Sequence, residues 1–438
     1  MVKIEKFLEY GVYLAVFLLS FQTRWILAPG ELSGKYWEYG TISLYVVDIV
    51  LVVVLFLWAW YWLRRERRRP SSRLRIPWFW WLLSGWDLMV FISIFAASDH
   101  GVALYRYLIF LLGLGLAALL IHTPIKKVKL VYSLVLGLVL QAVLGIGQFL
   151  DQFGPACKYL GLARHDPAHL GVSVVETVGA DGVARRWLRA YGGLDHPNIL
   201  GGVLALGIII FLSFVSRRYG NNRNMRALSY VLTILLAAGL FFTFSRGAGL
   251  AVIAGLVVFG VGLAYKRRWP ELKIALSVLG VVAVFVAVLA FSYQSIVMTR
   301  LSGNTRLENK SNQERISSYA RAGSIIKQNP FFGVGVGNYT LALSQTSKDP
   351  LTWSYQPVHN TFLLIWAEIG VVGFFFLVGL ILYLAVQSLR QGNITNLAIL
   401  TSLVIMLMVD HWWWSLHFGM LFLGLVLGLL FKNLKSNK

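Results

Sequence analysis

The chain has 438 residues, of which 57% are hydrophobic and only 13% are charged, and its mean hydropathy is +0.67. Ordinary soluble domains carry about 25% charged residues, so the composition excludes a soluble protein. The formal charge of +21 would favour nucleic-acid binding only if the basic residues shared one face, but they lie between apolar spans, so no nucleic-acid partner is expected. A single cysteine, Cys157, excludes internal disulfides and cysteine-rich metal sites.

Apolar runs long enough to cross a bilayer recur along the chain. A transmembrane helix needs about 20 such residues, and the sequence predicts twelve spans near residues 7–27, 41–63, 76–97, 104–122, 130–150, 197–216, 227–244, 247–265, 273–292, 360–387, 396–410 and 413–431. Lys3 and Lys6 precede the first run, which lacks a cleavage signal and is read as a retained helix. The expected fold is an all-α polytopic membrane protein, with residues 1–438 in a single membrane domain.

The loops that join these spans differ sharply in charge. One set is rich in Lys and Arg and comprises 64–75, 126–129, 217–226, 266–273 and the tail 432–438. Short loops rich in Lys and Arg stay in the cytoplasm, so both termini are predicted to be cytoplasmic. The stretch 64–75 is read as a topology determinant at the lipid headgroups.

Two long polar loops, 151–196 and 293–359, lie on the opposite, non-cytoplasmic side. In the second, SNQERISSYARAGSIIKQNP predicts a short amphipathic helix that lies along the membrane surface and ends at Pro330. Its expected apolar face comprises Ile316, Tyr319, Ala320, Gly323 and Ile326. The tryptophans of HWWWSLH (411–417) are read as an aromatic belt at the outer interface, with a sugar-stacking site as the weaker alternative.

Four segments carry polar groups at predicted membrane boundaries on the non-cytoplasmic side. They are YGGLDHPNILGG (191–202), FFTFSRGAGL (241–250), the helix around Arg315, and HNTFLLIWAEIGVVG (359–373). A charged group at such a boundary must be solvated or paired. Arg246 is such a group. Its guanidinium could reach outward to water or lie in a polar cavity, and the sequence favours neither. Four basic or imidazole-bearing segments on one side favour convergence on one anionic ligand.

These segments resemble the O-antigen ligases and O-antigen polymerases of the bacterial envelope. His359, Asn360, Gly370 and Gly373 match the family's H-N-x₉-G-x-x-G signature. The stretch from Arg315 to NPFFGVGVGNY resembles its Arg-led helix and G-x-G loop, FTFSRGAGL its Ser-Arg-Gly boundary, and DHPNILGG its His-Pro-Asn helix entry. The resemblance covers 190–375. Tyr319 stands where the family commonly has Trp.

The resemblance implies an undecaprenyl-diphosphate-linked glycan as donor at the outer leaflet of the inner membrane. Guanidinium groups suit a diphosphate leaving group because they bind it bidentately, and we assign this role to Arg246, Arg315 and Arg321. His359 is the candidate general base for the acceptor hydroxyl. Asn360 is expected to orient His359 or bind sugar, and His196 and Asn198 to shape the site and cap a helix.

A direct displacement at the anomeric carbon would invert its configuration. The resemblance also implies a reaction without a metal or other cofactor. Asp195, Glu308 and Glu314 have no ligand-like spacing, and Asp99, Glu368 and Asp410 are read as buried polar partners. The acceptor stays open between glycan, lipid and protein, so a polysaccharide polymerase or a protein ligase remains an alternative. A transporter of anionic solutes is an alternative of another class, although inverted repeats are not evident.

Overall fold

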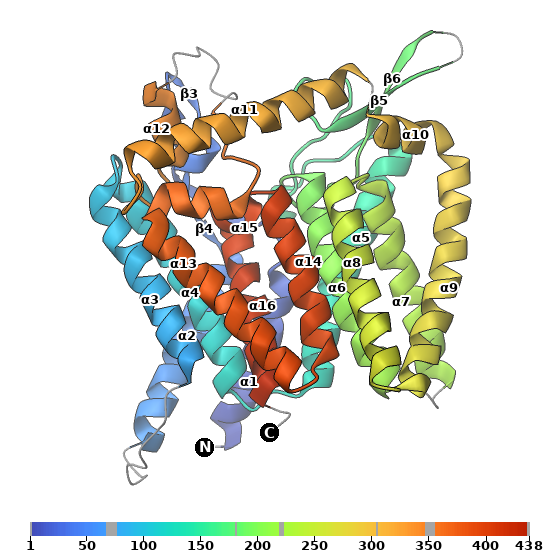
Figure 1. Cartoon of the computed structure of the whole chain (residues 1–438), viewed down its shortest axis with the longest axis horizontal. Coiled ribbons are helices and arrows are strands. Elements are labelled where there is room, and N and C mark those ends of the chain that lie inside the picture. The colour runs from blue at the N-terminus through green and yellow to red at the C-terminus, as the bar shows by residue number, and fades with distance from the viewer. Residues whose placement is uncertain are drawn as a thin grey trace.

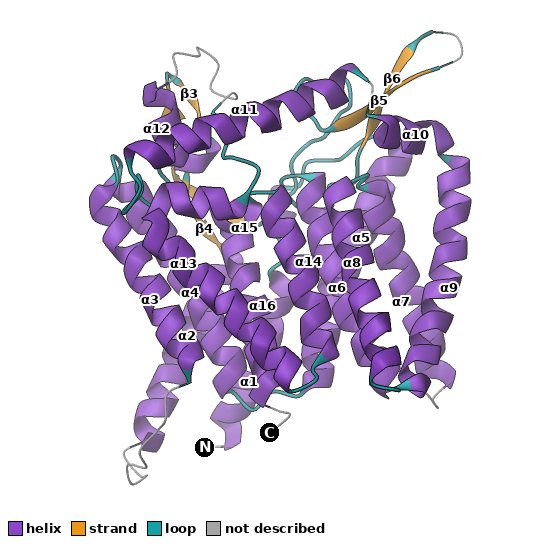
Figure 2. Cartoon of the chain, in the orientation of Figure 1, coloured by secondary structure: helices purple, strands orange, loops and turns teal. Residues whose placement is uncertain are grey.

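The computed structural model describes residues 2–66, 77–179, 182–218, 223–303, 305–346 and 355–435. Within these ranges the chain is almost entirely helical, as Figure 2 shows. Twelve helices in the described ranges overlap the twelve predicted spans: α1 (Val2–Leu18), α2 (Val46–Glu66), α3 (Trp78–Ser93), α4 (His100–His122), α5 (Lys127–Asp151), α6 (Pro197–Arg218), α7 (Arg223–Phe242), α8 (Arg246–Tyr265), α9 (Trp269–Ser292), α13 (Thr361–Arg390), α14 (Ile394–Val409) and α16 (His417–Lys435). Ten helices in the described ranges are long and apolar enough to cross a membrane, which confirms an all-α polytopic membrane protein.

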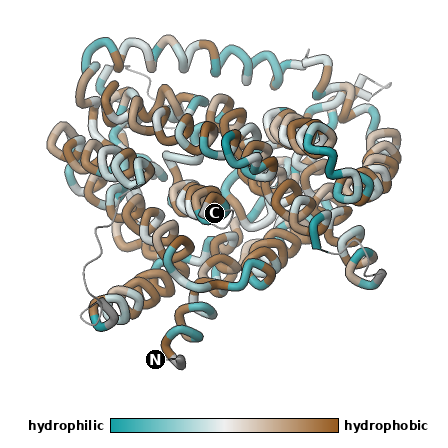
Figure 3. The backbone as a smooth tube through the Cα atoms, turned by 60° about the horizontal axis from the view of Figure 1, so that its bottom comes forward, coloured by the Kyte–Doolittle hydropathy of each residue, from teal (hydrophilic) through white to brown (hydrophobic). Residues whose placement is uncertain are grey.

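The bundle has two unlike ends (Figure 1). Both termini lie at one end, together with the C-terminal end of α6, the N-terminal end of α7 and the α8–α9 connection. The opposite end carries the three helices α10 (Gln294–Ser302), α11 (Arg306–Gln328) and α12 (Tyr339–Thr346), and the hairpin of β5 (Val174–Val178) and β6 (Ala184–Leu188). The extramembrane structure is therefore concentrated at the end that carries the two long loops. In Figure 3 the bundle helices are mainly hydrophobic, whereas α11 and the helix ends carry many hydrophilic residues.

Helix burial separates the centre of the bundle from its lipid-facing surface. The apolar stretch of α6 is buried all round, packed against α5, α7, α8, α9 and α14. The apolar stretch of α9 is only 11% buried. A helix that is apolar on every face must be covered by protein or by lipid, so α6 forms the core and α9 belongs to the bilayer boundary.

The N-terminal region departs from the predicted first span. Helix α1 ends at Leu18, and Arg24–Ala28 forms strand β1, which pairs with β4 (Ile42–Tyr45). Between them lie the two-residue strands β2 (Glu31–Leu32) and β3 (Lys35–Tyr36) and the 3₁₀ turn η1 (Glu38–Gly40). The apolar residues Trp25, Ile26 and Leu27 had extended the predicted span to 27, but they lie in a strand and are exposed. An uninterrupted run of apolar residues does not distinguish the end of a helix from a short strand that follows it.

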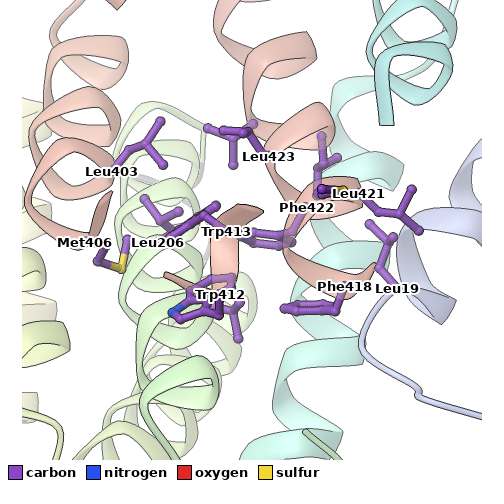
Figure 4. Packing of buried hydrophobic residues seen from close by; sticks show 14 of the residues in the cluster. Leu19, Leu206, Leu403, Met406, Trp412, Trp413, Phe418, Leu421, Phe422 and Leu423 are labelled. Carbon is purple, nitrogen blue, oxygen red and sulfur yellow. The ribbon is translucent and has the colours of Figure 1, made fainter. Parts of the chain in front are cut away.

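The prediction of an aromatic belt for 411–417 is wrong. Trp412, Trp413 and Trp414 form the one-turn helix α15 (Trp412–Ser415) and are each no more than 2% exposed. Trp412 and Trp413 stack at 4.2 Å between ring centroids, and Figure 4 shows them packed among residues of α6, α14 and α16. These rings fill the interior where α14 meets α16, because the chain re-enters the bundle between the two helices.

Helix α11 is longer than predicted and packs through a different face. Its buried residues include Ser318, Ala322, Ile325 and Ile326, whereas Ile316 is 72% exposed and Tyr319 is 41% exposed. The spacing of four, three and one places the buried residues on one stripe, where small side chains let α11 lie close against α13. Of the predicted apolar face, only Ile326 is buried.

The Gly-rich segment GVGVGN (333–338) is tightly bonded to α13. The backbone N–H groups of Val334 and Gly335 donate to the carbonyls of Ala367 and Glu368. Helix α13 is kinked at Gly370, where φ is +77° and an added Cβ would lie 1.8 Å from the carbonyl oxygen of Phe331. Only glycine accommodates both conditions, and the signature glycine thus lets the loop dock on the helix.

Candidate functional site

A cavity of about 480 Å³, lined by both polar and apolar groups, opens at the end of the bundle where α6 and α13 begin. This volume falls within the range of small-molecule sites. Its lining joins the N-terminal strand region, the entry to α6, the segment before α13 and the start of α15, and comprises Lys35, Tyr36, Glu38, Tyr39, Asp195, His196, Asn198, Ile199, Tyr355, Gln356, His359, Asp410, His411, Trp412 and Leu416. Three of the residues singled out from the sequence, His196, Asn198 and His359, meet here.

A chain of polar side chains runs from a buried arginine to His359. Arg189 donates from Nη2 to Asn198 Oδ1 at 2.8 Å, and Asn198 donates from Nδ2 to Asp410 Oδ2 at 3.2 Å. Asp410 Oδ1 in turn lies 3.6 Å from His359 Nδ1. The carboxylate thus faces the imidazole while the amide and guanidinium behind it fix its position. This is the arrangement of a base oriented by an acid.

Backbone contacts hold Asp410 at the C-terminal end of α14. Its carbonyl accepts from Thr361 Oγ1 at 2.7 Å, and its Oδ1 accepts from the backbone N–H of His411 at 2.8 Å. Burial alone would raise the pKa of Asp410, but the imidazoles of His359 and His411 hold it below its usual range. Asp410 is therefore ionised at neutral pH. The sequence predicted a buried polar partner at this position, and the structure adds that Asp410 faces His359 directly.

The two residues expected to support the site from α6 have distinct structural roles. His196 Nδ1 accepts from the backbone N–H of Asn198 at 3.1 Å, so the imidazole caps α6. Burial and the charge of Arg189 lower the pKa of His196 to about 3, which keeps the ring neutral. Asn198 links Arg189 to Asp410 and does not cap the helix. Asn360 caps α13 by accepting from the N–H of Leu363 at 3.1 Å.

A second, smaller pocket of about 30 Å³ adjoins the cavity and gathers three guanidinium-bearing residues. They are Arg246 at the first position of α8, Arg300 of α10, and Arg315 of α11. Asn198, Asp410 and Trp412 line both spaces and form the wall between them. Arg246 and Arg315 therefore converge as predicted from their shared side, and His359 lies across this common wall.

Glu308 of α11 neutralises part of this positive charge. Its carboxylate pairs with Arg300, and its Oε2 lies 3.0 Å from Arg246 Nη2. Arg246 also donates to the carbonyl of Arg300 at 3.3 Å. The Glu308 side chain is 5% exposed, so a buried internal carboxylate is paired with Arg246 and Arg300. Burying a carboxylate in this way requires such paired charges.

The remaining two predicted site residues lie at the margin. Tyr319 places its hydroxyl 3.5 Å from the carbonyl oxygen of His359, so α11 passes over the segment that carries the histidine. Arg321 is absent from the lining of both spaces in the described ranges and lies near Tyr339, where its charge lowers that hydroxyl's pKa against the effect of burial. The structure therefore separates Arg321 from Arg315.

Sequence reasoning missed Arg189, Arg300 and His411 and gave Glu308 no role. Arg189 is 5% exposed and donates to Thr243, Ser173 and Asn198. Burial and the nearby Arg300 lower its pKa to about 9. The only local signal was a cluster of arginines ahead of the DHPN segment. Asn198 and Asp410 are 212 positions apart, and no spacing rule relates them.

The site also contains a group of side chains with metal-ligating atoms. His359, Asp410 and His411 each offer one such atom, and these atoms all lie within 4.8 Å of one another. No metal site was predicted from the sequence, because Asp195, Glu308 and Glu314 have no ligand-like spacing and the family resemblance implies a reaction without a metal. The cluster arises from the fold, which brings the start of α13 against the end of α14.

Known proteins share the central part of this chain. Residues 231–378 match the family model for O-antigen ligase. A curated O-antigen ligase of Salmonella typhimurium is 28% identical over 197 residues, which is 38% of this chain and 45% of that protein. The match thus spans under half the length of that relative. Arg246, Arg315 and His359 all fall within 231–378, the part of the chain that is similar to the O-antigen ligase family.

Proposed function

We propose that this protein transfers a glycan from an undecaprenyl-diphosphate-linked donor to an acceptor hydroxyl, with inversion and without a metal. The observation that carries the proposal is the common wall of Asn198, Asp410 and Trp412. It separates a pocket containing Arg246, Arg300 and Arg315 from a cavity containing His359. A cationic subsite beside a base is the arrangement that displacement of an anionic leaving group requires.

The guanidinium pocket receives the diphosphate in this proposal. As the anomeric C–O bond breaks, the electron pair goes to the bridging oxygen, and the leaving lipid diphosphate gains negative charge. Planar guanidinium groups stabilise that charge through paired hydrogen bonds. Arg246, Arg315 and the additional Arg300 supply them, whereas Arg321 contributes indirectly through the position of α11.

The imidazole of His359 removes the proton of the acceptor hydroxyl. The acceptor oxygen forms the new bond to the anomeric carbon from the face opposite the leaving diphosphate, which inverts configuration. Asp410 lies 3.6 Å from His359 Nδ1 and stabilises the imidazolium that forms. Asn198 and Arg189 hold this carboxylate in place. Tyr36, Tyr39 and Asp195 face the same cavity and offer contacts to the incoming acceptor.

The ion pairs of Glu308 correspond to a closed state in this proposal. A pocket of about 30 Å³ does not accommodate a diphosphate. The donor must therefore displace the carboxylate of Glu308 from Arg246 and Arg300. Because one anion replaces another, the guanidinium groups remain paired throughout. Movement of the N-terminal part of α11 would open the pocket without disturbing its C-terminal contacts with α13.

We place this reaction at the outer leaflet of the bacterial inner membrane, with the cavity on the periplasmic side. The loop charges support that orientation. The expected partners are the lipid-linked glycan, the bilayer, and a glycan, lipid or protein acceptor.

Glycan analysis of a deletion strain tests the proposal and separates its forms. Accumulation of lipid-linked long chains is the result expected for a ligase. Accumulation of single repeats would indicate a polymerase instead. A deletion strain with unchanged envelope glycans and unchanged glycoproteins would reject glycan transfer in every form. Complementation with the intact gene provides the control.

A further inference from the structure

We propose that His359, Asp410 and His411 form a site for a divalent transition-metal ion such as Zn²⁺, and that the ion inhibits the protein. Two imidazoles and one carboxylate make up a ligand set that Zn²⁺ commonly uses. Their ligand atoms lie within 4.8 Å of one another and face an open cavity of about 480 Å³. The inhibition rests on the proposed function, whereas the metal binding does not.

The separations suit a tetrahedral ion. Metal–ligand bonds of about 2.0–2.2 Å place neighbouring tetrahedral ligand atoms about 3.3–3.6 Å apart. His359 Nδ1 and Asp410 Oδ1 are already 3.6 Å apart. The His359 and His411 ring centroids are 5.0 Å apart, so a small side-chain rotation closes the set. His359 Nδ1 is buried and has no hydrogen-bond partner among the described residues.

Hydrogen bonds behind the cluster prepare the other two ligands. His411 Nδ1 lies 2.7 Å from Ser415 Oγ, and that hydroxyl donates to the His411 carbonyl. Because the Ser415 hydroxyl already donates its proton to that carbonyl, it must accept a hydrogen bond from His411 Nδ1. The ring proton of His411 therefore lies on Nδ1, and the lone pair of Nε2 is free to bind a metal. Asp410 is held by Asn198 at 3.2 Å. Such outer contacts orient metal ligands in known sites. The fourth position points to the cavity and is open to water.

Binding of the ion would prevent glycan transfer without unfolding the site. The ion occupies the imidazole nitrogen of His359 that faces Asp410 and holds the ring in a fixed orientation. It also occupies the carboxylate that would stabilise the imidazolium. The arginine pocket lies beyond the shared wall and keeps its affinity for anions. Zinc is therefore expected to lower turnover while leaving donor binding intact.

Equilibrium dialysis of the full-length, EDTA-treated protein against Zn²⁺ tests the site. We expect one ion per chain, a rise in Tm with the ion, and loss of both in His411→Ala and Asp410→Asn. Ser415→Ala keeps all three ligands and should weaken binding about 10- to 100-fold. If the ligand variants fold poorly, Ser415→Ala still tests the site, because it keeps all three ligands.

His169 provides the matched control. Its Nδ1 lies 3.6 Å from Asp166 Oδ2, the same separation as in the His359–Asp410 pair, but both residues lie on an exposed loop without a third ligand in the described ranges. His169→Ala should retain one ion per chain. No bound zinc in the unmodified protein, or equal zinc in the His411→Ala and Ser415→Ala variants, would overturn the proposal.

Transfer assays with and without Zn²⁺ then test inhibition. Activity should survive EDTA, fall with Zn²⁺ and return when EDTA is added again. Bound zinc with undiminished transfer would overturn the inhibition. Zinc binding in a protein that never transfers glycan would leave the metal site in place and reject the proposed function.

Discussion

His359 is the residue on which the proposed chemistry depends most. Its side chain is 26% exposed to the cavity, and Asp410 lies behind it at 3.6 Å. His359→Ala should lower turnover about 10²- to 10⁴-fold, the usual contribution of a general base. Expression and donor binding should persist, because Nδ1 of the ring has no hydrogen-bond partner among the described residues. Steady-state transfer assays measure the effect, and near-normal turnover would remove His359 from the mechanism.

Arg246 tests whether geometry or charge binds the diphosphate. Arg246→Lys keeps the positive charge but loses the bidentate fork, so donor affinity and turnover should both fall. Arg306→Lys is the matched control, because Arg306 is an exposed guanidinium that pairs with Glu176 at 3.1 Å. An exposed pair of this kind contributes little, and this variant should transfer normally. Equal activity of both variants would mean that charge alone suffices.

Asp195 makes the stability of the folded protein depend on pH. Its side chain is open to the cavity yet surrounded by protein, and burial together with Glu38 raises its pKa to about 6. An unfolded aspartate titrates near about 3.9. The folded state therefore binds the proton more tightly, and Asp195 costs stability increasingly as pH rises from about 4 to 6. Water in the cavity reduces the size of this effect.

Asp195→Asn should therefore raise Tm relative to the unmodified protein at about pH 7. The difference should shrink as the pH falls below about 6 and should vanish near about pH 3, where the carboxyl is protonated in both states. Thermal unfolding across this range measures it, with Asp151→Asn, exposed at the end of α5, as the control. A difference in Tm that persists unchanged at about pH 3 would show that desolvation of the carboxylate is not its cause.

At the scale of elements, the kink in α13 is the most sharply defined feature. Gly370 combines φ of +77° with contact against the carbonyl of Phe331. Gly370→Ala should lower Tm strongly and release the segment 333–338 from α13. Gly323→Ala in α11 is the control, because an added Cβ there meets nothing within 4 Å. It should be neutral or slightly stabilising, since alanine favours helix by about 1 kcal/mol. Similar Tm values for the two variants would contradict this account.

The helices were predictable from the sequence, whereas several contacts between them were not. Long apolar runs locate α2 to α9 because the bilayer sets a length that the hydropathy pattern reports directly. The strands β1 and β4 were missed because Trp25, Ile26 and Leu27 continue an apolar run. The packing face of α11 was misplaced because Ser318 and Ala322 pack by being small, and a hydrophobic pattern gives them no weight.

The site was predictable in part for a different reason. Arg246, Arg315 and His359 each stand at a membrane boundary, where a polar group requires a partner. Their common side suggested convergence, and the two adjoining spaces bring them together. Arg321 failed this test because position 321 is six residues from 315 and points to another face of the helix. The roles of Arg189 and Asp410 come from tertiary contacts, so the sequence alone held no spacing that could reveal them.

At the scale of the whole molecule, the polar site and the long extramembrane helices share one end of the bundle, and both termini share the other (Figure 1). The C-terminal end of α6, the N-terminal end of α7 and the α8–α9 connection lie at the end with the termini. The sequence segments 217–226 and 266–273 carry an excess of Lys and Arg. A lipid-linked donor with its sugar at the outer leaflet can reach the cavity only if the termini are cytoplasmic. Orientation is thus a requirement of the proposed function.

Reporter fusions test that orientation directly. Fusions at 70, 220 and 270 should report the cytoplasm, and fusions within 155–190 and 300–355 should report the opposite side, because short basic loops are retained in the cytoplasm. Paired reporters that are active on opposite sides of the membrane serve as internal controls at each position. An inverted pattern would turn His359 and the arginine pocket toward the cytoplasm. The same contacts would persist, but an outer-leaflet donor could not reach them, and the mechanism would fail even though the fold remained correct.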